Sequence, residues 1–113
     1  MSSTAKSSTP HLPLTPAVFS ILLALADGEK HGYAIMLEAR QHITMGPGTL
    51  YGSIDRLLAS GLIQETGLSD DERRRYDRLS ALGKQVLSAE ASRLEQSVSR
   101  ARSKGVRIAE VRA

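Results

Sequence analysis

The chain has 113 residues, of which 15 are Lys or Arg and 12 are Asp or Glu, so its formal net charge is +3. This length suits one small domain, and the lack of cysteine excludes disulfides and thiolate metal sites. The longest apolar run, residues 21–26, is far shorter than the ~18 residues of a membrane span, and the N-terminus does not resemble a secretory signal. We therefore expect a soluble cytoplasmic protein without a membrane partner, whose mild positive charge permits a polyanionic partner without requiring one.

The N-terminal residues 1–13 are rich in Ser and Thr, contain Pro10 and Pro13, and show no hydrophobic period. This composition predicts a flexible tail. A folded domain is expected over residues 14–80, followed by a C-terminal helix over residues 81–113.

The first predicted helix covers residues 17–26. Thr15 followed by Pro16 is typical of a helix start, because threonine accepts hydrogen bonds from free amides and proline fits the first helical position. The helix is apolar on all sides except at Ser20, and such a helix must be buried on all sides. One small domain rarely covers a terminal helix completely, so we expect a second subunit to pack against it.

Two further helices are predicted over residues 32–41 and 49–60, with a break at residues 44–48 that contains two glycines and a proline. The earlier helix carries Ile35, Met36 and Ala39 on one face. The later helix has an apolar inner stripe, and Gly61 is placed to cap its C-terminus. The stripe consists of Leu50, Ile54, Leu57 and Leu58.

Segments 62–66 and 75–79 have the composition of short strands, and they flank a charged loop. This pattern predicts a β-hairpin, and Ser80 after it is a good N-cap for a last helix. The order of elements predicts a mainly α fold: a winged helix-turn-helix of three helices plus a two-stranded β-wing, with a long C-terminal dimerisation helix. The third helix is then the one that reads DNA.

The last helix carries a heptad seam, in which apolar or small residues are spaced alternately four and three apart. The seam consists of Leu87, Ala91, Leu94, Val98, Ala101, Gly105 and Ile108. A helix folded back on its own domain explains the start of the seam but not the part beyond Leu94. We therefore predict a homodimer built by the first and last helices, with contacts at Val18, Leu22, Leu25, Leu87, Ala91, Leu94, Val98, Ala101 and Ile108.

No catalytic, metal or cofactor site is predicted, and the chain is not expected to be an enzyme. His11 lies in the tail, and His31 and His42 lie at opposite ends of a short helix without a carboxylate cluster, so exposed polar residues at helix ends are the preferred interpretation. Gly46 and Gly48 precede a helix, but no lysine follows them as in an enzyme's phosphate-binding loop. The N-terminus of that helix can still hold a DNA phosphate.

The outer face of the third helix holds the first group of candidate DNA contacts. Gly48 and Ser53 are small enough to allow close approach to a groove. Thr49 and Tyr51 can donate hydrogen bonds to phosphates, and Arg56 is the only cation on this face.

The predicted wing holds the second group, Arg73, Arg74 and Arg75. Phosphate or minor-groove contacts by these arginines require the neighbouring acids to point elsewhere. The acids are Asp70, Asp71, Glu72 and Asp77. They balance these three arginines and Arg78, so the segment has zero net charge. A solvated charged loop with internal ion pairs is the alternative interpretation.

Three segments carry a distinctive set of motifs. Residues 31–35 read His-Gly-Tyr-Ala-Ile. Residues 46–51 read Gly-Pro-Gly-Thr-Leu-Tyr and are followed by Arg-Leu at 56–57 and Gly-Leu-Ile at 61–63, while residues 74–80 read Arg-Arg-Tyr-Asp-Arg-Leu-Ser. In this order and spacing, with Gly83, they resemble the PadR family of transcriptional regulators over residues 14–87, and the length and single trailing helix resemble its shorter subgroup.

The resemblance implies a winged helix-turn-helix homodimer that binds double-stranded operator DNA, represses transcription and often responds to a small-molecule effector. Asp77 stands where the family usually has an aromatic residue. From the residues and the resemblance together, we predict DNA contacts at Tyr33, Thr44, Pro47, Gly48, Thr49, Tyr51, Ser53, Arg56, Arg73, Arg74 and Arg75. A nucleoid-associated location follows from this hypothesis. Two alternatives stay open: a winged-helix protein-interaction module without DNA binding, and a small-molecule sensor.

Overall fold

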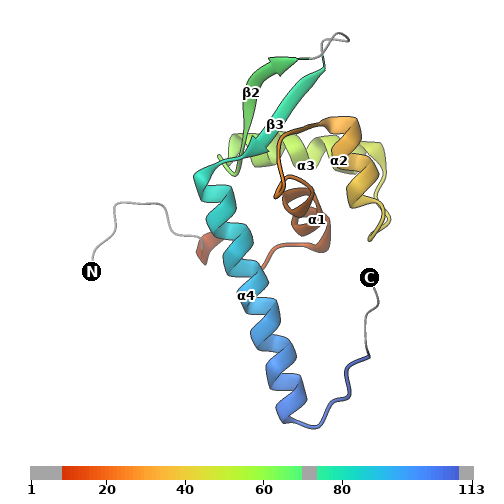
Figure 1. The fold of residues 1–113 in the computed structure, drawn as a ribbon, viewed down its shortest axis with the longest axis vertical. Helices are drawn as coiled ribbons and strands as arrows, with labels where there is room; N and C mark the ends of the chain where they lie inside the picture. Colours follow the sequence, from red (N-terminus) through yellow and green to blue (C-terminus); the bar gives the residue numbers. More distant parts are fainter. Residues whose placement is uncertain (1–8, 70–73, 110–113) are drawn as a thin grey trace, which may run out of the picture.

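The computed structural model describes residues 9–69 and 74–109. The described residues form five helical segments and three strands in a winged helix-turn-helix arrangement. Figure 1 shows the wing at one end and the C-terminal helix extending toward the other. The elements in chain order are η1 (Thr9–His11), α1 (Pro16–Ala24), β1 (Lys30–His31), α2 (Gly32–Ala39), α3 (Pro47–Ala59), β2 (Ile63–Ser69), β3 (Arg75–Leu79) and α4 (Ala81–Ser103). The mainly helical fold class and the order of the predicted elements are confirmed.

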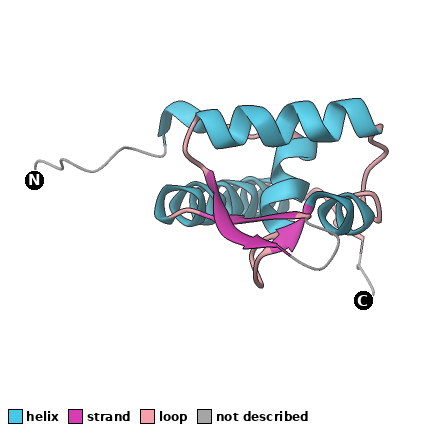
Figure 2. Cartoon of the chain, turned by 90° about the horizontal axis from the view of Figure 1, so that it is seen from above, coloured by secondary structure: helices cyan, strands magenta, loops and turns pink. Residues whose placement is uncertain are grey.

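The sheet has three antiparallel strands in the order β1-β3-β2, one more than the hairpin predicted from the sequence. In the added ladder Lys30 pairs with Asp77 and His31 pairs with Tyr76. A strand of two residues has no alternating pattern, so sequence periodicity could not reveal it. In Figure 2, which looks onto the molecule from above, the strands lie in front of the helices.

Local capping explains where the first and third helices begin and end. The Thr15 hydroxyl accepts a hydrogen bond from the Val18 amide, as predicted. Helix α3 begins at Pro47, two residues before the predicted start, because proline lacks only an amide that would have no intrahelical partner at that position. Gly61 has a φ of 79° and ends the helix as predicted, since that left-handed conformation favours glycine.

The long helix α4 begins at Ala81 and is capped by Ser80, whose hydroxyl accepts a hydrogen bond from the Gly83 amide at 2.9 Å. It ends at Ser103, and Gly105 follows with a φ of 82°. The amides of Val106 and Gly105 donate to the carbonyls of Ala101 and Arg102, which is a Schellman ending. The prediction that the helical seam continues through Gly105 to Ile108 is therefore wrong, and Ile108 lies beyond the helix.

The core forms around α1, which is covered by the other helices and the root of the wing. Ile21 and Leu22 of this helix are completely buried, together with Ile35, Leu50 and Ile54 from α2 and α3. Leu25 and Leu87, also predicted at the dimer interface, belong to the same buried cluster. Leu22, Leu25 and Leu87 are therefore corrected to core residues, because a single chain already removes them from solvent.

The chain N-terminal to α1 also packs on the domain. Leu12 and Leu14 lie against the core, and the Leu14 amide donates to Oε2 of Glu90 on α4 at 3.3 Å. Arg93 donates two further hydrogen bonds to the Glu90 carboxylate, at 2.6 and 2.9 Å, and these hold the pKa of Glu90 below its usual range. The predicted tail over residues 1–13 thus ends earlier, because residues 9–13 are ordered on the fold; residues 1–8 lie outside the described part.

Candidate nucleic-acid interface

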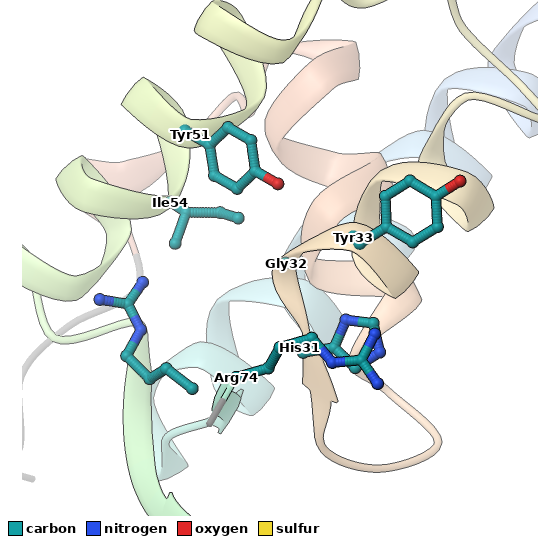
Figure 3. Close-up of a pocket in the computed structure, with 7 residues that line it drawn as sticks. His31, Gly32, Tyr33, Tyr51, Ile54 and Arg74 are labelled. Carbon is teal, nitrogen blue, oxygen red and sulfur yellow. The ribbon is translucent and has the colours of Figure 1, made fainter. Parts of the chain in front are cut away.

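A cleft of about 230 Å³ opens between the first half of α3, the start of α2 and the wing. Figure 3 shows Tyr51 and Ile54 on α3, Tyr33 on α2 with its ring turned outward, and Arg74 on the segment just before β3. The complete lining is His31, Gly32, Tyr33, Tyr51, Ile54, Arg74 and Arg75. Four predicted DNA contacts from three separate segments, Tyr33, Tyr51, Arg74 and Arg75, therefore meet at one place.

Tyr51 is held in the cleft by a close approach between two helices. Its ring packs on Gly32 so tightly that a Cβ atom at that position would lie 2.9 Å from Cε1 of the ring. Because ordinary carbon contacts are about 3.5–4.0 Å, only glycine allows this contact without displacement. The tyrosine side chain is still 45% exposed, so one side of it is fixed while the rest faces solvent.

His31 is a structural member of the cleft whose role the sequence did not predict. Its Nδ1 atom accepts from the Ala34 amide at 3.3 Å, so the imidazole caps α2. The ring also makes an edge-to-face contact with Tyr76 of the wing, with centroids 5.4 Å apart. The expectation of an exposed helix-end residue is corrected: His31 is half-buried and joins α2 to the wing.

The N-terminus of α3 is open to solvent beside this cleft. Pro47, Gly48 and Thr49 are exposed, as is Thr44 in the preceding turn. Gly46 is the N-cap and supplies no side-chain hydrogen bond to the first turn. Free backbone amides and the positive end of the helix dipole favour an anion such as a phosphate at such a terminus.

Ser53 does not face the cleft. It is only 3% exposed and accepts a hydrogen bond from Nη2 of Arg56 at 3.2 Å. Both residues line a different hollow, formed against the segment that contains His11 and Leu14. Ser53 is therefore corrected from a DNA contact to a buried residue, because its position on the helix turns it toward α1, whereas Arg56 is exposed.

In the wing, Arg75 has acidic neighbours on its own sheet. Its guanidinium lies 3.9 Å from Glu65 and 3.5 Å from Asp77. This geometry agrees with the internal pairing that the alternative interpretation of the wing required, although Arg75 also lines the cleft. Arg74 is exposed there too, and Arg73 lies outside the described residues.

Part of the surface predicted for dimerisation is exposed to solvent. On α4, Leu94 and Val98 are each 38% exposed and Ala91 is exposed, while Ala101 is half-buried. Figure 1 shows the second half of α4 extending past the other helices. On α1, Val18 is half-buried, and Leu23, which was not among the residues predicted at the interface, is 47% exposed.

A groove of about 360 Å³ lies between α1 and α2. Its apolar walls include Phe19, Leu23 and Ile43, and Glu38 and His42 add polar groups.

Within residues 9–69 and 74–109, no group of three or more His, Cys, Asp or Glu side chains is arranged to hold a metal ion. In the same part of the chain, no helix is both long and apolar enough to cross a membrane.

The sequence pattern of the transcriptional regulator PadR-like family matches residues 21–89, which include α1, the helix-turn-helix, the wing and the first part of α4. The chain belongs to the PadR-like family. This is a family of transcriptional regulators and not of enzymes, so membership implies DNA binding. The family predicted from the three motifs is confirmed.

Individual proteins are also similar to this chain. Transcriptional regulator Rv3488 of Mycobacterium tuberculosis is 36% identical over 78 residues, covering 67% of this chain and 73% of that protein. An uncharacterized 37.1 kDa protein in transposon TN4556 of Streptomyces fradiae is 41% identical over 73 residues, 63% of this chain; the match spans only 21% of the transposon protein. The crystal structure of a PadR family transcription regulator from Clostridium difficile has the same fold, with a TM-score of 0.70 at 20% identity over 79% of this chain and 97% of that one.

Proposed function

We propose that this PadR-family protein is a homodimeric repressor that binds the promoter it controls through α3 and the wing. The observation that carries the proposal is the convergence of Tyr33, Tyr51, Arg74 and Arg75 on one cleft beside the open N-terminus of α3. Hydroxyl, guanidinium and free amide groups are the donors that phosphate oxygens accept from. Base reading is left to the exposed surface of α3, as in other helix-turn-helix proteins.

Dimerisation is proposed through α4 and the outward side of α1. Leu94 and Val98 form an apolar strip on the part of α4 that extends past its own domain, and Leu23 adds an exposed leucine on α1. Pairing of this strip with a second copy removes the leucine and valine side chains from water. Two copies related by a two-fold axis then present two α3 helices to successive major grooves.

We also propose that a small-molecule effector releases the protein from DNA, and the groove between α1 and α2 supports this. Its volume of about 360 Å³ falls in the range of small-molecule pockets. Glu38 and His42 provide polar groups in an otherwise apolar lining. A ligand held beside Leu23 would alter the neighbouring dimer contact and with it the spacing of the two α3 helices.

The test is a fluorescence anisotropy titration of a duplex from the protein's own promoter, at two salt concentrations, against an unrelated duplex of equal length. Specific binding with a steep salt dependence is expected, because phosphate contacts release counterions. A promoter–reporter assay should show higher expression when the protein is deleted. Equal and negligible affinity for both duplexes would favour the protein-interaction alternative.

The dimer is tested by sedimentation equilibrium at micromolar concentration, where about twice the chain mass is expected. Leu94→Arg should shift the protein toward monomer, because pairing would bury a charge without a partner. Gln96→Arg is the matched control, since Gln96 is exposed on the same helix but outside the heptad seam. A monomer at every concentration would contradict the proposed assembly.

A further inference from the structure

The wing contains a buried carboxylate at the edge of the cleft. Asp77 is only 1% exposed, and its Oδ1 atom has no hydrogen-bond partner among the residues that the structure describes. It lies on β3 two residues from Arg75, so the two side chains share one face of the sheet. Buried carboxylates normally have hydrogen-bond partners, and an exception beside a DNA-binding surface requires an explanation.

The charges around Asp77 are predominantly negative. Glu65 is its direct partner across the β2–β3 ladder, and Asp55 on α3 also acts on it electrostatically. Lys30 is its partner on β1, but the lysine ammonium is bound to the Ala24 carbonyl and the Asp27 carboxylate. Within the described part of the chain, the cation paired with Asp77 is therefore Arg75, whose Nε atom lies 3.5 Å from Oδ1 of Asp77.

Arg75 consequently has three competing anionic partners once DNA arrives: Glu65, Asp77 and a phosphate. Its guanidinium side chain is 45% exposed and lines the cleft with Tyr51, where the proposed function places a DNA phosphate. The same side chain stabilises the charged form of Asp77 in the free protein. Moving the arginine to a phosphate would leave a buried carboxylate without a counterion, which is strongly unfavourable unless the carboxylate takes up a proton.

We propose that Asp77 is a positioning residue that holds Arg75 against the wing, and that DNA binding releases the arginine as Asp77 takes up a proton. This inference rests on the proposed DNA binding. It makes affinity for DNA higher at lower pH, because the bound state carries an additional proton.

The electrostatics of Asp77 support this proton uptake. Burial raises the pKa of Asp77, and among its charged neighbours Arg75 lowers it while Glu65 and Asp55 raise it. DNA binding removes the one lowering contribution and adds phosphate charge nearby, so both changes raise the pKa further. Each pKa unit of such a rise weakens binding of the ionised protein about tenfold.

The experiment compares wild type with Asp77→Asn, which keeps the size of the side chain and removes its charge. Affinity for the promoter duplex and for an unrelated duplex is measured by anisotropy between about pH 5 and pH 8, a range above the ordinary carboxyl pKa. The variant should bind both duplexes about tenfold more tightly at the upper end of the range, because no carboxylate then competes with the phosphate for Arg75. The gain should shrink as the pH falls and wild-type Asp77 becomes protonated.

The role of Arg75 is tested by a double-mutant cycle. The gain from Asp77→Asn should disappear in an Arg75→Ala background, because there is no longer an arginine to release. Asp55→Asn is the matched control: it removes one exposed carboxylate of α3, and its effect should persist in the Arg75→Ala background. A gain from Asp77→Asn that also persists there would overturn the proposal, because Asp77 would then act only as a background charge.

Proton uptake by the wild-type protein is an independent readout that does not depend on the folding of an Asp77 variant. Calorimetric titration with the promoter duplex in two buffers of different ionisation enthalpy gives the number of protons taken up. His31→Asn, which retains a good N-cap, shows how much of the uptake belongs to the imidazole in the same cleft. The inference would be refuted if His31→Asn abolished the uptake entirely, or if wild type and Asp77→Asn had the same affinity at every pH. Either result would leave DNA binding itself established. Failure of wild type to bind either duplex would refute the proposed function as well.

Discussion

Replacing Gly32 by alanine tests whether the position of the Tyr51 ring controls DNA binding. The added Cβ atom would lie 2.9 Å from Cε1 and 3.7 Å from the hydroxyl oxygen of the tyrosine. Since ordinary carbon contacts begin at about 3.5 Å, the ring has to retreat by about 0.6 Å or more. A hydrogen bond of about 2.8 Å from the hydroxyl to a phosphate would then be stretched beyond its favourable range.

We expect Gly32→Ala to weaken binding to the promoter duplex by about 1 kcal/mol per protomer, the net contribution of one hydrogen bond. A dimer that loses two such bonds binds about thirtyfold more weakly. Folding should not suffer from the backbone change itself, because alanine is favoured over glycine in helices by up to about 1 kcal/mol. Anisotropy titration measures the affinity, and thermal denaturation of the same samples measures the stability.

The matched variant is Tyr51→Phe, which keeps the ring and removes only the hydroxyl. It should lose a similar amount of affinity, and adding Gly32→Ala to it should have little further effect, because the bond in question is already absent. If Gly32→Ala binds as wild type does, the ring has no role in binding. If its full loss persists without the hydroxyl, the glycine acts through something other than Tyr51.

Two further predictions concern ion pairs. Glu90→Gln should lower the free energy of unfolding at pH 7 by about 1 kcal/mol, whereas Glu95→Gln, an exposed change on the same helix, should not. Because Arg93 holds the pKa of Glu90 below its usual range, this stabilisation is present above the unfolded-state pKa and disappears as the pH falls through the lower folded-state pKa. Denaturation at a series of pH values measures this loss. Replacing Arg74 and Arg75 by alanine should weaken binding to promoter and unrelated DNA alike and reduce the log–log salt slope by about 0.9 for each phosphate that the variant no longer neutralises; an unchanged slope with an intact fold would make the wing a structural hairpin.

Features set by a few neighbouring residues could be predicted from the sequence. Thr15, Ser80 and Gly61 each act within one helical turn, and the structure places all three at the predicted helix ends. Gly105 shows where a prediction from residue spacing alone fails. It continues the spacing of the heptad seam, but its left-handed conformation ends the helix instead, because a glycine can satisfy both patterns until the surrounding backbone is known.

Contacts between distant parts of the chain could not be predicted in the same way. The bond from the Leu14 amide to Glu90 joins residues 76 positions apart, and no local rule connects them. The division of apolar residues between core and partner surface was equally inaccessible. Leu22 and Leu23 are neighbours on a helix that is apolar all round, yet one is completely buried and the other is 47% exposed, and only the packing of α2, α3 and α4 decides which is which.

The three parts of the proposed DNA-binding surface are joined physically by one short segment. Lys30 and His31 pair with the wing strand β3, and His31 also caps α2 and contacts Tyr76. The next residue, Gly32, packs on Tyr51 of α3. A displacement of this segment would therefore move the wing and the tyrosine of α3 together. This arrangement explains why residues 31–33 carry a recognisable motif although only Tyr33 among them is exposed: the other two hold the surrounding elements in register, and the affinity for DNA depends on that register.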